Sequence, residues 1–127
     1  MLDSANLVAF LATSRPEEAK RFYREKLGLL FVQDDENHIV FDSNGTILRI
    51  QRVPELVPTG NIALSWEVEN LLATVASLKS RGIRFERMPG VEQDANDIFV
   101  AYDGTMVAWF RDPDGNLLSL SEHAERL

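Results

Sequence analysis

The apolar positions in the first half of the chain predict one strand, one helix and three further strands. Residues 7–13 form an apolar run typical of a strand. The apolar residues of the next segment repeat with a helical period and share one face: Ala19, Phe22, Tyr23 and Leu27. Ser14 and Glu17 have the spacing of a capping box before this helix, and Gly28 ends it. The three strands are expected at about 29–34, 37–42 and 46–52.

The second half of the chain shows the same order of elements. A strand is expected at 61–68, and a helix follows whose inward positions are Leu71, Leu72, Val75 and Leu78. This helix is expected from about Asn70 to Arg81, with Gly82 as its end. Three more strands are expected at about 83–88, 105–111 and 117–121. The segment 89–104 is too long for a hairpin, so it forms either a flap or an extra short strand within 98–102.

The two halves also match each other residue by residue. Residues 7–31 lie over 61–85 without a gap, and four positions are identical: Ala9 with Ala63, Ala19 with Ala73, Gly28 with Gly82, and Phe31 with Phe85. Residues 42–50 lie over 112–120 and share the pattern Asp-x-x-Gly followed by apolar positions. The match therefore indicates an internal duplication.

This duplication predicts an α+β fold of two tandem βαβββ modules. Module 1 covers about 5–52, a linker with two prolines and a glycine covers 53–60, and module 2 covers about 61–122. We expect one domain over 1–127 in which two curved, mostly antiparallel sheets carry their helices outside and enclose a cup.

The segment "DPDG" at 112–115 holds two aspartates separated by one proline, which raises the question of a catalytic or metal-binding pair. Its residue types are those of a tight turn: Asp accepts backbone hydrogen bonds, Pro fixes φ, and Gly supplies a positive φ. The matching segment "DSNG" of the first half keeps the Asp and the Gly but lacks the second carboxylate. We therefore predict that Asp112 and Asp114 form a turn.

Composition limits the classes of function. The chain has 127 residues, of which 45% are hydrophobic, which is enough for a folded core. Without cysteine it can form no disulfide, no thiolate metal site and no cysteine nucleophile. A net charge of -7 without any basic run argues against nucleic acid as a partner. The first residues lack a signal-peptide pattern, and no apolar run has membrane-spanning length. We therefore expect a cytoplasmic protein that does not bind a membrane.

Three motifs in this order resemble the vicinal oxygen chelate superfamily, the glyoxalase, bleomycin resistance and extradiol dioxygenase group. They are "FYREKLGL" after the first helix, "NIALSWEVEN" at the start of the second module and "FRDPDGNLLSL" near the end. The resemblance implies paired βαβββ modules, a cupped sheet around a cavity and a homodimer, but it fixes no reaction. In metal-using members of this family, His or Glu on the first and last strand of each module hold a divalent ion that acts as a Lewis acid.

None of the four matching positions has such a ligand. On the first strand the position falls on Leu7, Val8 or Ala9, and on the opening strand of module 2 it falls on Asn61 or Ala63. The family's glutamate falls on Ser119 and its first-module counterpart on Arg49, whose guanidinium repels cations. His38 and His123 are expected in solvated or capping roles. We therefore predict no metal ion and no other cofactor.

The family's orientation of the strands predicts which residues line the cup. We expect ligand-binding roles for Arg49, Gln51, Asn61, Ser65, Trp109, Ser119 and Ser121. Arg49 offers a charged fork for a carboxylate or phosphate, or for an internal pair with Glu67. Trp109 is either a wall of the cavity or part of the core, and Trp66 is expected under the helix. Glu67 is either a buried general base or a strand-end glutamate paired with a lysine or arginine.

Three functions remain open at this point. The first is metal-independent binding of a polar small molecule in the cup, comparable in class with the family's drug-binding resistance members. The second is a lyase, isomerase or dioxygenase-type enzyme that uses an atypical metal site or Glu67 as a general base. The third is a protein with a filled cup that works through dimer contacts or a partner.

Overall fold

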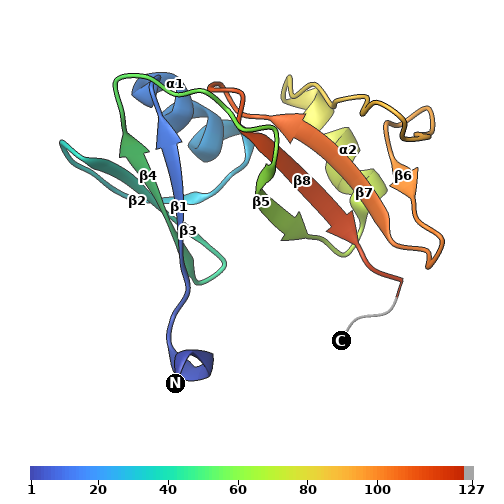
Figure 1. Cartoon of the computed structure of the whole chain (residues 1–127), viewed down its shortest axis with the longest axis horizontal. Helices are drawn as coiled ribbons and strands as arrows, with labels where there is room; N and C mark the ends of the chain where they lie inside the picture. The colour runs from blue at the N-terminus through green and yellow to red at the C-terminus, as the bar shows by residue number, and fades with distance from the viewer. Residues whose placement is uncertain (125–127) are drawn as a thin grey trace. The chain divides into compact units, whose positions relative to one another are not determined.

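The computed structural model describes residues 1–124 of the chain, and its contacts divide the chain into two compact units. They are Met1–Val57 and Pro58–Leu127. Each unit holds one four-stranded sheet with a helix beside it (Figure 1). This confirms the α+β class and the two βαβββ modules, while a single domain over the whole chain stays a prediction.

The first unit consists of a short 3-10 turn and then the predicted order of strand, helix and three strands. Its elements are η1 (Leu2–Ser4), β1 (Val8–Thr13), α1 (Pro16–Arg21), η2 (Phe22–Lys26), β2 (Leu30–Asp34), β3 (His38–Ser43) and β4 (Thr46–Arg52). The strands lie in the order β1-β4-β3-β2, with β1 parallel to β4 and the other neighbours antiparallel. The parallel pair is possible because the helix crosses over between its strands.

The start of the first helix differs from the prediction. Arg15 is the N-cap residue and makes no side-chain capping bond, because a guanidinium has no acceptor atom, and Pro16 takes the first helical position. Proline suits this position since it has no N–H to satisfy and its φ is already helical. The backbone N–H of Arg15 donates to the Thr13 hydroxyl at 3.0 Å instead. The predicted capping box is therefore wrong, although the helix itself is confirmed.

The first helix packs on one face of its sheet. Ala19, Phe22 and Tyr23 are buried, and the rings of Tyr23 and Phe41 lie 6.1 Å apart. Leu27, the fourth expected residue, is only half-buried. Its N–H donates to the Phe22 carbonyl at 3.0 Å, a π-helical bond that closes the η2 turn.

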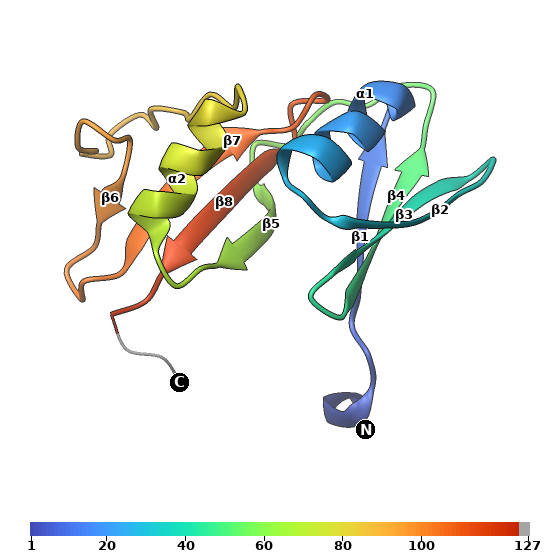
Figure 2. The same ribbon diagram turned by 180° about the vertical axis from the view of Figure 1, so that it is seen from behind.

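The second unit repeats this topology. Its elements are β5 (Ile62–Glu67), α2 (Leu71–Ser80), β6 (Phe99–Val100), β7 (Met106–Arg111) and β8 (Leu117–Glu122). The order of its strands is β5-β8-β7-β6, with β5 parallel to β8. Figure 2 shows α2 running across one face of this sheet. No helix among residues 1–124 combines the length and the apolar character needed to cross a membrane.

Helix α2 is capped by two side chains. Asn70 accepts from the Ala73 N–H at 3.0 Å, and Glu122 at the end of β8 accepts from the Leu71 N–H at 2.8 Å. Both bonds satisfy N–H groups that a helix start leaves without a partner. The buried residues of the helix are Leu71, Val75 and Leu78. Leu72, which was expected to point inward, is 54% exposed because the other three already complete one helical stripe.

The strand expected at 83–88 does not form. Only an isolated bridge joins Phe85 to Phe110, and the Glu86 N–H donates to the Trp109 carbonyl at 2.8 Å. The chain then leaves the sheet and returns as β6, which confirms the alternative of an extra short strand within 98–102. The apolar residues of 83–88 did not show that this segment pairs with β7 through a single bridge.

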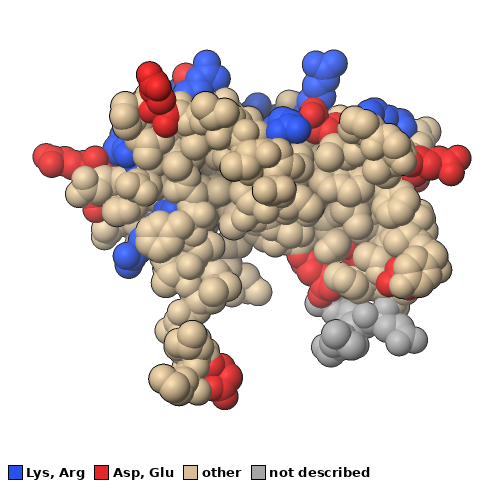
Figure 3. All heavy atoms as spheres, in the orientation of Figure 1, with Lys and Arg blue, Asp and Glu red and all other residues tan. Residues whose placement is uncertain are grey.

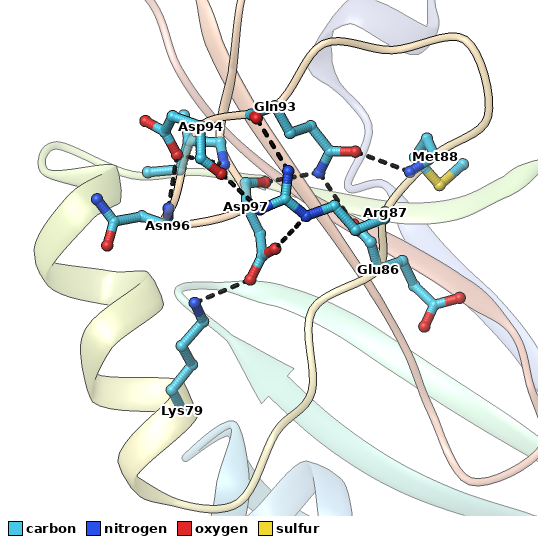
Figure 4. Close-up of polar contacts among 9 residues, drawn as sticks. Lys79, Glu86, Arg87, Met88, Gln93, Asp94, Asn96 and Asp97 are labelled. Atoms are coloured by element: carbon cyan, nitrogen blue, oxygen red, sulfur yellow. Dashed lines mark hydrogen bonds and ion pairs between the residues drawn. The ribbon is translucent and has the colours of Figure 1, made fainter.

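The loop before β6 is held together by Gln93 (Figure 4). Its amide nitrogen donates to the carbonyls of Glu86 at 2.9 Å and Asp97 at 2.8 Å. Its amide oxygen accepts from the Met88 N–H at 2.7 Å. One side chain thus connects both ends of the loop.

Arg87 and Asp97 form a second set of contacts in the same loop (Figure 4). The Arg87 guanidinium donates to the carbonyls of Gln93 at 2.9 Å and Asp94 at 2.7 Å, and it pairs with the Asp97 carboxylate at 2.8 Å. Lys79 of α2 pairs with the same carboxylate at 2.9 Å. The loop is therefore fixed to the helix, and it is not an open flap.

The segment 112–115 is a turn, as predicted. The Gly115 N–H donates to the Asp112 carbonyl at 2.9 Å, and Gly115 has a φ of 87°. The Asp112 carboxylate accepts from the N–H groups of Asp114 at 3.0 Å and Asn116 at 2.9 Å. A Cβ on Gly115 would lie 3.0 Å from Pro58, so this position favours glycine for two reasons.

Candidate functional site

The first sheet has one face that carries no helix, and we call it the open face of the first sheet. It is defined by alternate residues of β1, β4 and β3: Val8, Phe10, Ala12, Ile47, Arg49, Gln51, His38 and Val40. The residues between them on the strands are buried on the helix side: Leu11, Thr13, Leu48, Ile50, Ile39 and Phe41. Strand alternation thus separates the core from a surface that reaches solvent.

A pocket of about 310 Å³ opens on this face. Its lining comes from β2, β3, β4 and the turn after β2: Val32, Gln33, Asp35, His38, Val40, Ile47 and Arg49. Among the predicted site residues, Arg49 lies in this lining, and Gln51 lies next to it on β4, opposite His38. The structure therefore brings Arg49 together with residues that sequence reasoning did not assign to the site.

Arg49 is held at the middle of the sheet. It lies on β4 between its register partners Phe10 on β1 and Val40 on β3. Arg49 is exposed, and its guanidinium has no ion pair or hydrogen bond within residues 1–124. An arginine between apolar neighbours offers a planar fork of donors that a carboxylate or phosphate can accept.

Asp35 gives the pocket its negative group. Its Oδ1 accepts from the backbone N–H groups of His38 and Asn37, each at 2.8 Å. These bonds, first that of His38, hold the pKa of Asp35 below its ordinary value, so the carboxylate is charged at neutral pH. The His38 ring lies edge-on to Phe10 with centroids 6.2 Å apart and forms one wall.

The open face of the second sheet carries most of the other predicted residues. The register places Ser65 beside Ser119 and Ser119 beside Trp109, and the two serine hydroxyls are bonded at 2.8 Å. Glu67 lies beside Ser121 on the same face. Ser119 is buried at 3% exposure, so its hydroxyl is occupied within the fold.

The two tryptophans lie on opposite faces of this sheet. Trp109 is half-buried on the open face, with its ring 6.3 Å from Phe99. Trp66 is the register partner of the buried Leu120 and faces the helix side, as expected.

The sequence argument for Asn61 fails. Asn61 precedes β5, and its N–H donates to the Thr59 hydroxyl at 3.3 Å. A register shift between Ile62 and Leu64 interrupts the alternation that was to place Asn61 with Ser65. A role of Asn61 in binding stays a prediction.

Glu67 is exposed and paired with a histidine. Its carboxylate contacts Nδ1 of His123, and the two side chains are 39% and 47% exposed. Of the two alternatives for Glu67, the buried general base is wrong, and the imidazole of His123 is one partner of its carboxylate. Sequence reasoning missed His123 as a partner, although its position two residues after Ser121 continues the alternation of β8.

The residues at the family's metal positions do not fit a divalent ion. Val8 shares the open face with Arg49 on the first sheet, and neither can ligate a cation. On the second sheet, the Ser119 hydroxyl is bonded to Ser65, and Asn61 stands before the strand. Among residues 1–124, no three His, Asp or Glu side chains gather in a way that could hold a metal.

Charged side chains do not form large regions of one sign on the face drawn in Figure 3. On the face drawn in Figure 3, acidic and basic side chains alternate with wide neutral areas. The pocket on the open face of the first sheet has charged groups of its own, Arg49 and Asp35.

Comparison with known proteins supports the fold. The sequence model described as Glyoxalase/Bleomycin resistance protein/Dioxygenase superfamily matches residues 5–120. No curated protein sequence matches the chain.

Several solved structures are similar in fold at low sequence identity. A lactoylglutathione lyase from Agrobacterium tumefaciens is 18% identical, with a TM-score of 0.69 over 94% of this chain and 93% of the other. A glyoxalase/bleomycin resistance protein from Catenulispora acidiphila is 24% identical, with a TM-score of 0.70 and coverage of 94% and 98%. An antibiotic-binding protein from a Streptomyces species is 23% identical, with a TM-score of 0.70 and coverage of 98% and 99%.

Proposed function

This chain belongs to the glyoxalase/bleomycin resistance protein/dioxygenase superfamily, and we propose that it binds a small anionic molecule at Arg49 without a metal ion. The observation that carries this proposal is the exposed guanidinium of Arg49, which lines a pocket and has no partner within residues 1–124. A superfamily fold supports many activities, so the proposal rests on the site and not on the fold.

The walls of the pocket suit a small ligand. Val40 and Ile47 offer apolar surface beside the Arg49 fork, and Gln33 adds a neutral hydrogen-bonding group. The volume of about 310 Å³ lies at the lower end of the range of ligand pockets, roughly 300 to 1,000 Å³. A ligand of a dozen or so heavy atoms therefore matches the site better than a large drug.

Residues outside the pocket are proposed as ligand contacts for each unit separately. Gln51 extends the polar row of β4 beyond Arg49. On the second unit, the residues proposed as ligand contacts of that module are Asn61, Ser65, Trp109, Ser119 and Ser121. A homodimer and a cytoplasmic location are further parts of the proposal that rest on the family resemblance and on composition.

The test compares two arginines with the same change. Arg49→Gln removes the charge in the pocket, and Arg84→Gln removes an exposed charge of the second unit without a partner in residues 1–124. Small aromatic and aliphatic carboxylates and inorganic phosphate serve as probes in amide chemical-shift titrations. We expect Arg49→Gln to weaken binding about fivefold or more, and Arg84→Gln to leave it unchanged. Equal binding by wild type and Arg49→Gln would contradict the proposal.

The metal-independent part has its own test. The titration is repeated with protein treated with a chelator and then with protein given Zn²⁺, Mn²⁺ or Ni²⁺. Because the residues at the family's metal positions offer no suitable ligands, we expect the dissociation constant to stay the same in all samples. A loss of binding after chelation that the metal restores would show a metal-dependent site.

A second candidate function is general-base chemistry at Glu67 and His123. The contact of Glu67 with Nδ1 of His123 favours it, because a carboxylate in this place orients the ring and leaves Nε2 as a base. This version is tested by following solvent deuterium exchange into small carbonyl compounds with wild type, Glu67→Gln and His123→Gln. Exchange that both variants lose would support an enzyme, whereas equal rates in all three proteins would exclude this base.

A further inference from the structure

The pocket on the open face of the first sheet contains two charged side chains of opposite sign. Arg49 and Asp35 both line it, and they form no ion pair with each other. Two such groups around one cavity leave room for a molecule that carries both complementary charges. We infer that the ligand of this pocket is a zwitterion, with an anionic group on Arg49 and an ammonium group on Asp35. This inference rests on the proposed binding function and adds the class of ligand.

The Asp35 carboxylate is prepared for this role by the turn between β2 and β3. Its Oδ1 is fixed by the N–H groups of Asn37 and His38, so the direction of the carboxylate is set by the backbone. Within residues 1–124, its Oδ2 accepts a single long bond of 3.4 Å from the Gln33 amide nitrogen. This oxygen keeps the capacity to accept a hydrogen bond from an ammonium group.

Hydrogen bonds join the turn to β4 and β3. The Arg52 guanidinium donates to the Asp35 carbonyl at 3.1 Å, and the Asp35 N–H donates to the His38 carbonyl at 2.9 Å. A carboxylate fixed before binding loses little conformational freedom when a ligand arrives.

The register separates the two charges. His38 stands opposite Gln51, whereas Arg49 stands opposite Val40, two residues further along β3. Along this face Val40 lies beside Arg49, His38 lies toward the Asp35 turn, and Ile47 lies on the far side of Arg49. A matching ligand therefore has its two charges on a compact, partly apolar skeleton, as in an amino acid or another small amino carboxylate.

Two sets of probes test the inference. Within each set the compounds share one skeleton and differ in which charged groups they carry. The first set is phenylalanine, phenylpropionate and phenethylamine, and the second is ε-aminocaproate, caproate and hexylamine. The two sets cover a short and a long distance between the charges. Binding is measured by amide chemical-shift titration of the full chain at neutral pH. We expect one of the zwitterions to bind about fivefold more tightly than both of its single-charge analogues.

Variants assign the effect to the two side chains. Asp35→Asn keeps the shape and an acceptor for the backbone bonds, and we expect it to reduce the zwitterion to the affinity of the carboxylate analogue. Glu36→Gln removes a neighbouring exposed charge that does not line the pocket, and we expect no change. Arg49→Gln is expected to reduce the zwitterion to the affinity of the amine analogue. Amide spectra of the unliganded variants check that the fold is retained.

The outcomes separate this inference from the proposed function. If the carboxylates bind as tightly as the zwitterions and Asp35→Asn has no effect, while Arg49→Gln abolishes binding, the zwitterion inference is overturned and anion binding stands. If neither set shifts the amides of the pocket and phosphate also fails, both are overturned. A zwitterion preference that survives in Asp35→Asn would assign the ammonium group to another residue and would also overturn the inference.

Discussion

The two modules share one topology, but their sheets differ at the central position of the open face. Arg49 on β4 and Ser119 on β8 each stand four residues after the glycine of the matching turn. Each lies between a parallel and an antiparallel neighbour strand. Arg49 is exposed and has no partner within residues 1–124, whereas Ser119 is buried and bonded to Ser65. The same strand position therefore serves an open pocket in one module and internal bonding in the other.

The comparison also explains why the gapless match of the two halves misleads about register. The bulge between Ile62 and Leu64 adds one residue to β5 relative to β1. The π-helical turn η2 adds one residue to the first helix, so that Pro16 to Gly28 is one residue longer than Leu71 to Gly82. The two insertions cancel, so the sequences align without a gap. Within β1 and β5, however, residues that are aligned after the bulge do not occupy equivalent positions in the sheets.

The largest expected effect concerns the common core. Phe41 on β3 and Phe110 on β7 are equivalent, since each is fully buried and stands opposite a leucine of the central strand, Leu48 or Leu118. We expect Phe41→Ala and Phe110→Ala each to lower the free energy of unfolding by about 3–5 kcal/mol. Urea unfolding followed by circular dichroism measures both values.

Equal losses would show that duplication has kept the two cores energetically alike. A loss below about 1 kcal/mol at either position would contradict the burial of that ring. Phe10→Ala serves as the control because Phe10 is 56% exposed on the open face and should have little effect on stability.

The sequence predicted the common parts of the modules because they depend on strong local signals. The apolar runs, the glycines that end the helices and the "DPDG" turn each have one dominant structural interpretation. The prediction of a strand at 83–88 failed because its apolar residues Ile83 and Phe85 are buried without strand pairing, apart from one bridge at Phe85. Burial and strand pairing produce the same sequence pattern, so periodicity cannot separate them.

The turns give the next largest effect and differ between the modules. Asp112 is 7% exposed and accepts from Asp114, Asn116 and the Asn116 side chain, whereas the Asp42 carboxylate accepts from the Gly45 N–H at 2.7 Å. We expect Asp112→Ala to cost about 2–3 kcal/mol and Asp42→Ala about 1 kcal/mol. Unfolding in urea compares the two variants, and an equal cost would mean that the extra bonds of Asp112 add no stability.

The pocket could not be found from the sequence alone. Gln33 of β2 lies on the face of Arg49 because β2 has a register shift between Phe31 and Gln33, whereas the β3–β4 ladder alone places His38 there. No residue type marks such a shift, so the alternation read from the sequence fails after it. Arg49 was predicted because it stands where metal-using members of the family have a metal-ligating side chain. The contact of Glu67 with His123 was missed for a similar reason, since it joins the end of one strand to the residue after another.

A smaller effect tests the difference at the central strand position directly. Ser119→Ala removes the hydrogen bond to Ser65 from a buried site, and we expect a loss of about 1 kcal/mol. Arg49→Ala changes an exposed residue without a partner in residues 1–124, and we expect a change within about 0.5 kcal/mol. Thermal unfolding of both variants should rank them in this order. The reverse order would mean that Arg49 stabilises the fold and is not reserved for a ligand.

The smallest effect concerns pH and the carboxylates that connect helix and sheet. Asp34 of β2 pairs with Lys20 of α1 at 3.2 Å and with Arg52 of β4, as Asp97 pairs with Lys79 and Arg87 in the second module. Burial raises the pKa of Asp34, but the Arg52 guanidinium and the Lys20 ammonium outweigh it, so the pKa lies below its ordinary value of 3.8.

Because the pKa of Asp34 is lowered in the folded state, its contribution to stability is present above pH 3.8 and is lost as the pH falls further. We expect Asp34→Asn to be less stable than wild type by up to about 1 kcal/mol at pH 7, since the group is partly exposed. The difference should shrink as the pH falls below 3.8 and the wild-type carboxyl takes up a proton and loses its pairs. Urea unfolding of wild type, Asp34→Asn and Glu36→Gln across this range measures it. A constant difference at all pH values would mean that Asp34 acts through packing and not through its charge.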